Sequence, residues 1–202
     1  MHPWQPVSQG LRWLRAGTLM TLVSTSLLVL LGGSLLGRII HPVHYLITIG
    51  FFVALAGTAR VALSSPASMG GKRLLGLALG AQIGDYALTK LAPHYYGQSF
   101  FSVAALCHHA EQALAVVGFF ALMLGLRSLA THVGRGDLGL AFVGLTVVAV
   151  ASWMLFWLVG NFNLRILWDN LYAMLACLGG YVFVYTLVLK KLAGAVDEFA
   201  SK

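Results

Sequence analysis

Charge is scarce in this chain of 202 residues, and negative charge is scarcest, since aspartate and glutamate together number only 6. All charged residues make up 9% of the sequence, against about 25% in soluble domains. Hydrophobic residues make up 59%. This composition excludes an ordinary soluble domain and predicts an integral membrane protein. The net charge of +7 is therefore better explained by membrane topology than by binding to nucleic acid.

Cysteine is also rare, with 2 residues in the chain. Cys107 and Cys177 both lie inside apolar runs and lack the spacing of a disulfide framework or a zinc site. We therefore expect them to pack as small hydrophobic side chains. A phosphate-binding loop is not indicated either, because such a loop needs a strand, a glycine-rich loop and a helix in succession, and the sequence lacks this context.

Long apolar runs dominate the sequence. A helix needs about 20 apolar residues to cross a bilayer, and six runs qualify, at about 18–37, 43–64, 74–92, 100–126, 138–160 and 166–189. Because further runs follow the first one, we expect it to be a span and not a cleaved signal peptide. The predicted fold class is an all-α integral membrane protein, a six-transmembrane-helix bundle with no soluble domain.

The basic residues predict the orientation of this bundle. If successive connections lie on alternate sides, ten of the 13 lysines and arginines fall on one side, which the positive-inside rule makes cytoplasmic. Both termini are then cytoplasmic. The chain divides into a cytoplasmic or interfacial segment at 1–17, the transmembrane bundle at 18–189 and a cytoplasmic tail at 190–202. We expect the bilayer to be a bacterial inner membrane or another plasma membrane.

The stretch ALCHHAEQALAVV, residues 105–117, places polar side chains inside an apolar run. Glu111 and, in the preceding run, Asp85 each lie about eleven residues into a span, so both fall near mid-membrane. An isolated charge there costs about 2.5 to 3.5 kcal/mol. Residues three and four apart share a helix face, which adds Thr89 to the Asp85 face. We predict a buried polar site that opens toward the outer face and is formed by Gln82, Asp85, His108, Glu111 and Gln112.

Several ligands would fit such a site, and the sequence leaves them open. A histidine beside a carboxylate can ligate a metal or share a proton. His108, His109 and His44 are the candidates for a metal ion or haem b, although His44 lies nearer the outer surface. In the plainest alternative, the polar groups only hydrogen-bond neighbouring helices. More polar residues gather at the predicted outer ends and loops, namely His41, His94, Asn161, Asn163, Arg165 and Asp169.

Glycine recurs every four residues in GLALGAQIG, at Gly76, Gly80 and Gly84. Small residues at this spacing let two helices approach closely. We therefore expect this face to lie in a close helix contact, either within the chain or with another protein.

Two classes of function fit these features best. The first is a non-enzymatic subunit or accessory protein of a membrane complex, which the small size, the lack of catalytic motifs and the glycine-rich faces favour. The second is a redox or proton-handling protein that binds haem, metal or quinone, which the buried acids and histidines favour. A small transporter or membrane sensor is a third. The expected partners are the lipid bilayer and other membrane subunits or a second copy of the chain, and the sequence leaves open whether the protein is an enzyme.

Overall fold

The computed structural model describes residues 4–31, 36–91, 103–162 and 171–202, and these parts of the chain contain six helices and no strand. The predicted all-helical class is thereby confirmed. The helices are α1 (Gln5–Leu31), α2 (Leu36–Ser64), α3 (Lys72–Leu91), α4 (Val103–His132), α5 (Gly136–Phe162) and α7 (Leu171–Ala200).

Four of these helices contain a stretch that is long and apolar enough to cross a membrane. The stretches are Pro42–Ser64 in α2, Leu106–His132 in α4, Gly136–Met154 in α5 and Cys177–Ala200 in α7. The described residues of α1 and α3 contain no stretch that meets the same requirement for length and hydropathy. α3 is the shortest helix, with 20 residues, and it carries Gln82, Asp85 and Lys90.

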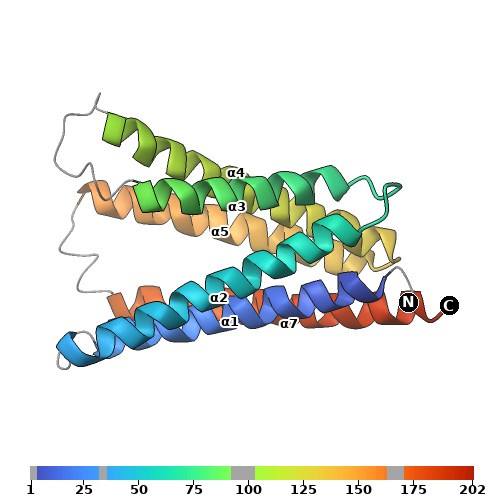
Figure 1. Cartoon of the computed structure of the whole chain (residues 1–202), viewed down its shortest axis with the longest axis horizontal. Coiled ribbons are helices and arrows are strands. Elements are labelled where there is room, and N and C mark those ends of the chain that lie inside the picture. Colours follow the sequence, from blue (N-terminus) through green and yellow to red (C-terminus); the bar gives the residue numbers. More distant parts are fainter. Residues whose placement is uncertain (1–3, 32–35, 92–102, 163–170) are drawn as a thin grey trace.

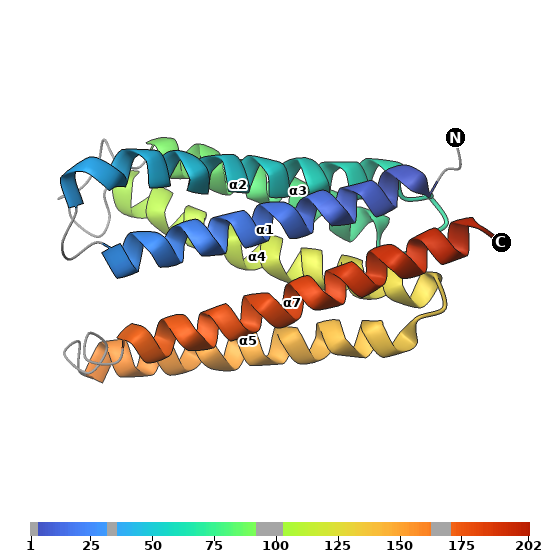
Figure 2. The same cartoon turned by 90° about the horizontal axis from the view of Figure 1, so that it is seen from below.

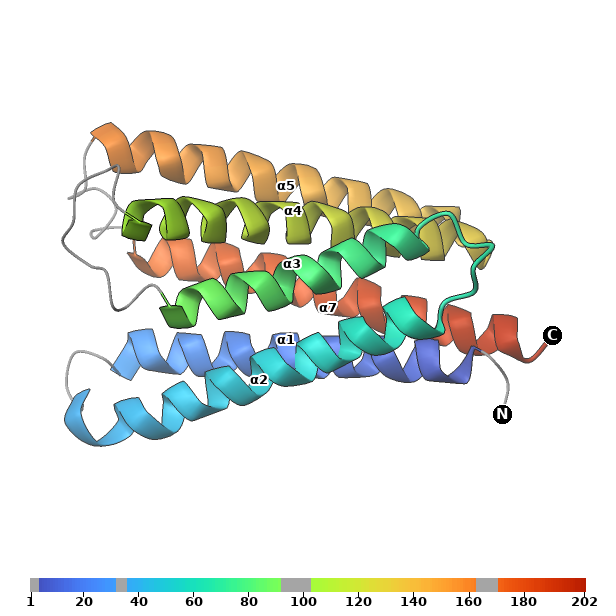
Figure 3. The same ribbon diagram turned by 45° about the horizontal axis from the view of Figure 1, so that its top comes forward.

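The helices run roughly along the long axis of the molecule (Figure 1). α1 packs against α2 and α7, and α4 packs against α3 and α5. α3 lies between α2 and α4, which Figure 3 shows most clearly. α1 begins and α7 ends at the same end of the bundle (Figure 2).

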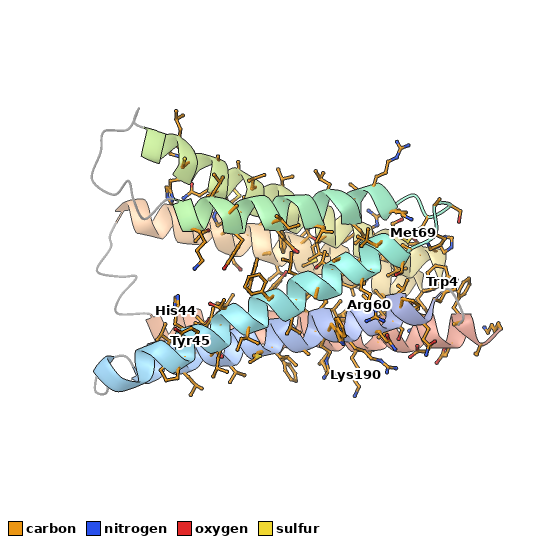
Figure 4. The ribbon with its side chains drawn as sticks, viewed as in Figure 1. Trp4, His44, Tyr45, Arg60, Met69 and Lys190 are labelled. Atoms are coloured by element: carbon orange, nitrogen blue, oxygen red, sulfur yellow. The ribbon has the colours of Figure 1, made fainter. Side chains whose placement is uncertain are left out.

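The buried side chains gather toward the end of the bundle where α1 begins and α7 ends. Trp4, 8% exposed, has its ring centroid 5.5 Å from that of His132 at the end of α4 and 5.4 Å from that of Phe199 near the end of α7. Figure 4 labels Trp4 there. Fully buried side chains come from all six described helices: Val7 and Leu11 of α1, Thr58 and Val61 of α2, Leu75 of α3, Leu126 and Leu129 of α4, Phe142 of α5, and Leu189, Leu192 and Val196 of α7.

The N-terminal segment forms part of this core. Residues 5–16, which lie before the first apolar run, belong to α1 without interruption. Val7 and Leu11 face the core, while Arg12 on the exposed side forms an ion pair with Asp197 of α7, at 2.7 Å. The apolar residues of this segment therefore lie on one face of the helix and the polar residue Arg12 on the other, as expected for helical periodicity.

Four glycines bring α1 and α2 into close contact. Gly10 and Gly17 on α1 face Gly57 and Gly50 on α2, and within each helix the two glycines are about two turns apart. A Cβ added to Gly57 would come under 3.0 Å from backbone atoms of Gly10 and Leu14. The two backbones therefore touch where no larger residue would fit, as in other closely packed helix pairs.

The glycines of α3 behave differently. Among the described residues, a Cβ on Gly76 or Gly80 would meet nothing within 4 Å, and one on Gly84 would meet only the side chain of Leu114, at 3.0 Å. The predicted close contact is thus wrong within this chain for Gly76 and Gly80. Their faces are open, because α3 meets α4 through Ala81 and Gly118 on a neighbouring face.

A tight turn joins α4 to α5. The Gly134 amide donates to the carbonyl of Thr131, and the Arg135 amide donates to the carbonyl of Ala130, at 2.8 Å. Gly134 has a φ of 77°, the left-handed conformation that such a helix end requires. This turn holds α4 and α5 as an antiparallel pair beside the polar residues described next.

Candidate functional site

A hydrogen bond between side chains joins α3 to α4. The Thr89 hydroxyl lies 2.9 Å from Glu111 Oε1 and 2.9 Å from the backbone carbonyl of Asp85, so its single proton can be donated to either oxygen. Glu111 is three-quarters buried, with 25% of its side chain exposed. Thr89 lies one turn beyond Asp85 on the same face of α3, and it is the residue of α3 that contacts the Glu111 carboxylate.

His108 extends the cluster along α4. Its Nδ1 lies 3.6 Å from Glu111 Oε2, and its Nε2 lies 3.0 Å from the Gln112 amide nitrogen. An amide nitrogen only donates, so His108 Nε2 accepts this bond and the ring proton of the neutral form lies on Nδ1. That nitrogen is the one nearest Glu111. The arrangement therefore orients a proton-bearing imidazole toward the carboxylate.

Asp85 and Gln82 complete the predicted set on α3. Asp85 is half-buried and lies one turn before Thr89 on the same face of α3. The backbone of Gln82 lies on the part of α3 that approaches α4, since a Cβ on Gly118 would be 3.8 Å from the Gln82 backbone nitrogen. The hydrogen bond of Thr89 with Glu111 joins the two helices, while His108 and Gln112 contact each other on α4, so a single site formed by all five predicted residues stays a prediction.

The three histidines considered for metal or haem do not all lie on neighbouring helices. The rings of His108 and His109 have centroids 6.2 Å apart on α4. His44 lies on α2 (Figure 4), which packs against α1 and α3, whereas α4 packs against α3 and α5. Among the described residues, no group of three or more histidine, cysteine, aspartate or glutamate side chains is arranged to hold a metal ion.

The predicted outer-face residues fall largely outside the described parts. His94, Asn163, Arg165 and Asp169 lie outside the described residues, and for His41 and Asn161 only the helical backbone is described. Their place at the outer face stays a prediction.

Sequence reasoning missed a groove between α4 and α5. It has a volume of about 900 Å³ and begins at Gln112, the last polar residue of the cluster. Its other lining residues are apolar: Ala115, Val116, Phe119 and Phe120 of α4, and Ala149, Val150, Trp153 and Met154 of α5. The α4 residues recur every three or four positions, so the sequence did contain the signal of a single helix face. The sequence did not show which helix would lie opposite this face of α4.

Comparisons of the chain with models of protein families, with curated proteins and with solved structures found no match.

Proposed function

We propose that the chain is a membrane protein with six spans and both termini in the cytoplasm. Four apolar helices of membrane length support a membrane location. The start of α1 and the end of α7 at one end of the bundle fit an even number of crossings (Figure 1). The ten basic residues predicted to be cytoplasmic supply the orientation.

Reporter fusions test this topology directly. Fusions after Ser68 and Thr131 are expected to report the cytoplasm, because both positions lie at the end of the bundle where α1 begins. A fusion after Gly97 is expected to report the opposite side. An external signal at Ser68 would contradict the proposed orientation.

Within the membrane, we propose that the protein acts as a non-enzymatic subunit or accessory protein of a membrane complex. The observation that carries this proposal is that one side of the polar cluster is exposed. Glu111 is hydrogen-bonded by Thr89 and is 25% exposed, but the His108 side chain is 57% exposed and Gln112 is exposed. Polar groups that face hydrocarbon are costly, so a polar residue of another membrane protein would complete the cluster.

The groove supports a second candidate function, the binding of a lipophilic molecule with a polar head, such as a quinone. Its volume of about 900 Å³ lies within the range of about 300–1,000 Å³ typical of small-molecule sites. The apolar walls would hold a ring or chain, and Gln112 would hydrogen-bond the head at the same place where the cluster opens.

Photocrosslinking separates these two functions. A photoreactive residue replaces Val116 in the groove, which leaves Gln112 intact, or replaces Val184 on α7 as a matched control. The two valines have similar exposure, 42% and 48%, and both lie thirteen positions past the first residue of their helix.

A crosslink to another protein at position 116, absent at 184, is the result expected for a subunit. A small organic adduct specific to position 116 would instead favour the lipophilic ligand. The same lipid adducts at both positions would contradict both candidate functions, because the groove would then be ordinary lipid-facing surface.

A further inference from the structure

A second groove lies on the opposite part of the molecule, over α1 and α2. It has a volume of about 450 Å³ and is lined by Trp13, Ile49, Phe52, Val53 and Ala56. The four residues of α2 follow the pattern i, i+3, i+4 and i+7, so they form one stripe along that helix. All five side chains are apolar, and the groove suits a hydrocarbon chain.

Arg60 ends this stripe, one turn beyond Ala56. Its guanidinium carbon lies 4.9 Å from the centroid of the Trp13 ring, in a cation–π contact that fixes the cation at the mouth of the groove. Among the described residues, the lysines and arginines that form ion pairs are Arg12 and Arg135, and Arg60 is not one of them. The N–H donors of Arg60 therefore face no carboxylate there, and a guanidinium pairs well with a phosphate.

The length of the stripe matches one leaflet of a bilayer. Ile49 and Arg60 are eleven residues apart, which corresponds to about 16 Å along a helix. Half of the hydrocarbon core of a bilayer is about 15 Å thick. Arg60 lies toward the end of the bundle that holds Trp4 and Met69 (Figure 4), which is the end proposed to be cytoplasmic.

We propose that this groove binds one anionic phospholipid of the cytoplasmic leaflet. The phosphate pairs with Arg60, and an acyl chain follows α2 between Trp13 and Phe52. An anionic headgroup is favoured over a zwitterionic one because Arg60 lacks a neighbouring acid among the described residues, so its charge is available to the lipid. This site is separate from the polar cluster of α3 and α4.

Fluorescence quenching of Trp13 tests the proposal. The full chain is reconstituted into vesicles of phosphatidylcholine and phosphatidylglycerol at one fixed ratio. Brominated chains, which quench tryptophan on contact, are carried by the phosphatidylglycerol in one preparation and by the phosphatidylcholine in the other. The Trp13 signal is obtained as the difference between each protein and its Trp13→Phe counterpart.

We expect phosphatidylglycerol to quench Trp13 about five-fold more than phosphatidylcholine at equal mole fraction. Arg60→Gln should reduce this ratio to near one, and Arg60→Lys should retain most of it, because the charge is kept. Arg73→Gln is the control, since Arg73 is an exposed base at the start of α3 that does not line the groove.

Two results would overturn the proposal. One is a wild-type ratio near one, which would mean that the groove does not distinguish the headgroups. The other is an equal loss in Arg60→Gln and Arg73→Gln, which would mean that the preference comes from the general surface charge.

Discussion

Replacing Gly57 with alanine is expected to destabilise the protein by about 1–3 kcal/mol, the range found when a well-packed contact is overfilled. The new Cβ would lie under 3.0 Å from backbone atoms of Gly10 and Leu14, which cannot move aside as the end of a side chain can. α1 and α2 would have to separate along their contact. The free energy of unfolding in mixed micelles measures the effect.

Gly80→Ala is the matched control for this substitution. Gly80 is also a helical glycine, but a Cβ there would meet nothing within 4 Å. It should not destabilise the protein and is expected to be neutral or stabilising, because alanine is favoured over glycine within a helix by about 0.5–1 kcal/mol. Equal destabilisation by the two substitutions would contradict the α1–α2 packing described above.

The second large effect is expected from the pair Thr89 and Glu111. Thr89→Val removes the hydroxyl that lies 2.9 Å from Glu111 Oε1, and Glu111→Ala removes the acceptor. If this hydrogen bond joins α3 to α4, the double variant should lose less stability than the sum of the single variants. Side chains in direct contact show coupling energies of about 0.5–3 kcal/mol.

Thr48 provides the control cycle for this measurement. Its hydroxyl donates to the carbonyl of His44 within its own helix, at 3.0 Å, just as Thr89 can donate to Asp85. Thr48→Val combined with Glu111→Ala should therefore be additive to within about 0.3–0.5 kcal/mol. Additivity of the same size in the Thr89 cycle would place Thr89 and Glu111 in separate environments.

The sequence predicted the helices well because apolar composition alone decides whether such a segment forms one. It predicted their ends less well at α1, where residues 5–16 mix basic and apolar side chains. Val7 and Leu11 belong to a core to which α7, which packs against α1 and lies far away in the sequence, also contributes. A short stretch of sequence contains no information on contacts with residues far away in the chain.

The glycines illustrate the same limit. Gly76, Gly80 and Gly84 have the spacing that usually indicates close helix packing, but the close contact uses Gly10 and Gly57. Which glycine faces another helix depends on the rotation and register of both helices. These are set by side chains on both partners, and one helix alone does not reveal them.

For the polar cluster, helical periodicity grouped Thr89 with Asp85 and His108 with Glu111. It did not show that Thr89 would be the residue of α3 nearest the Glu111 carboxylate, because that depends on the relative height of the two helices. The role of the cluster in binding stays a prediction.

The pairing of α1 with α7 has a consequence for biosynthesis. α1 leaves the ribosome first, and the Arg12–Asp197 ion pair joins positions 185 residues apart. The α1–α2 and α3–α4 hairpins can assemble while translation continues. The apolar face of α1 that contains Val7 and Leu11 is covered completely only after α7 has been synthesised. A nascent chain interrupted before α7 would expose this face, and it would be a substrate for membrane chaperones and quality-control proteases until the last helix arrives.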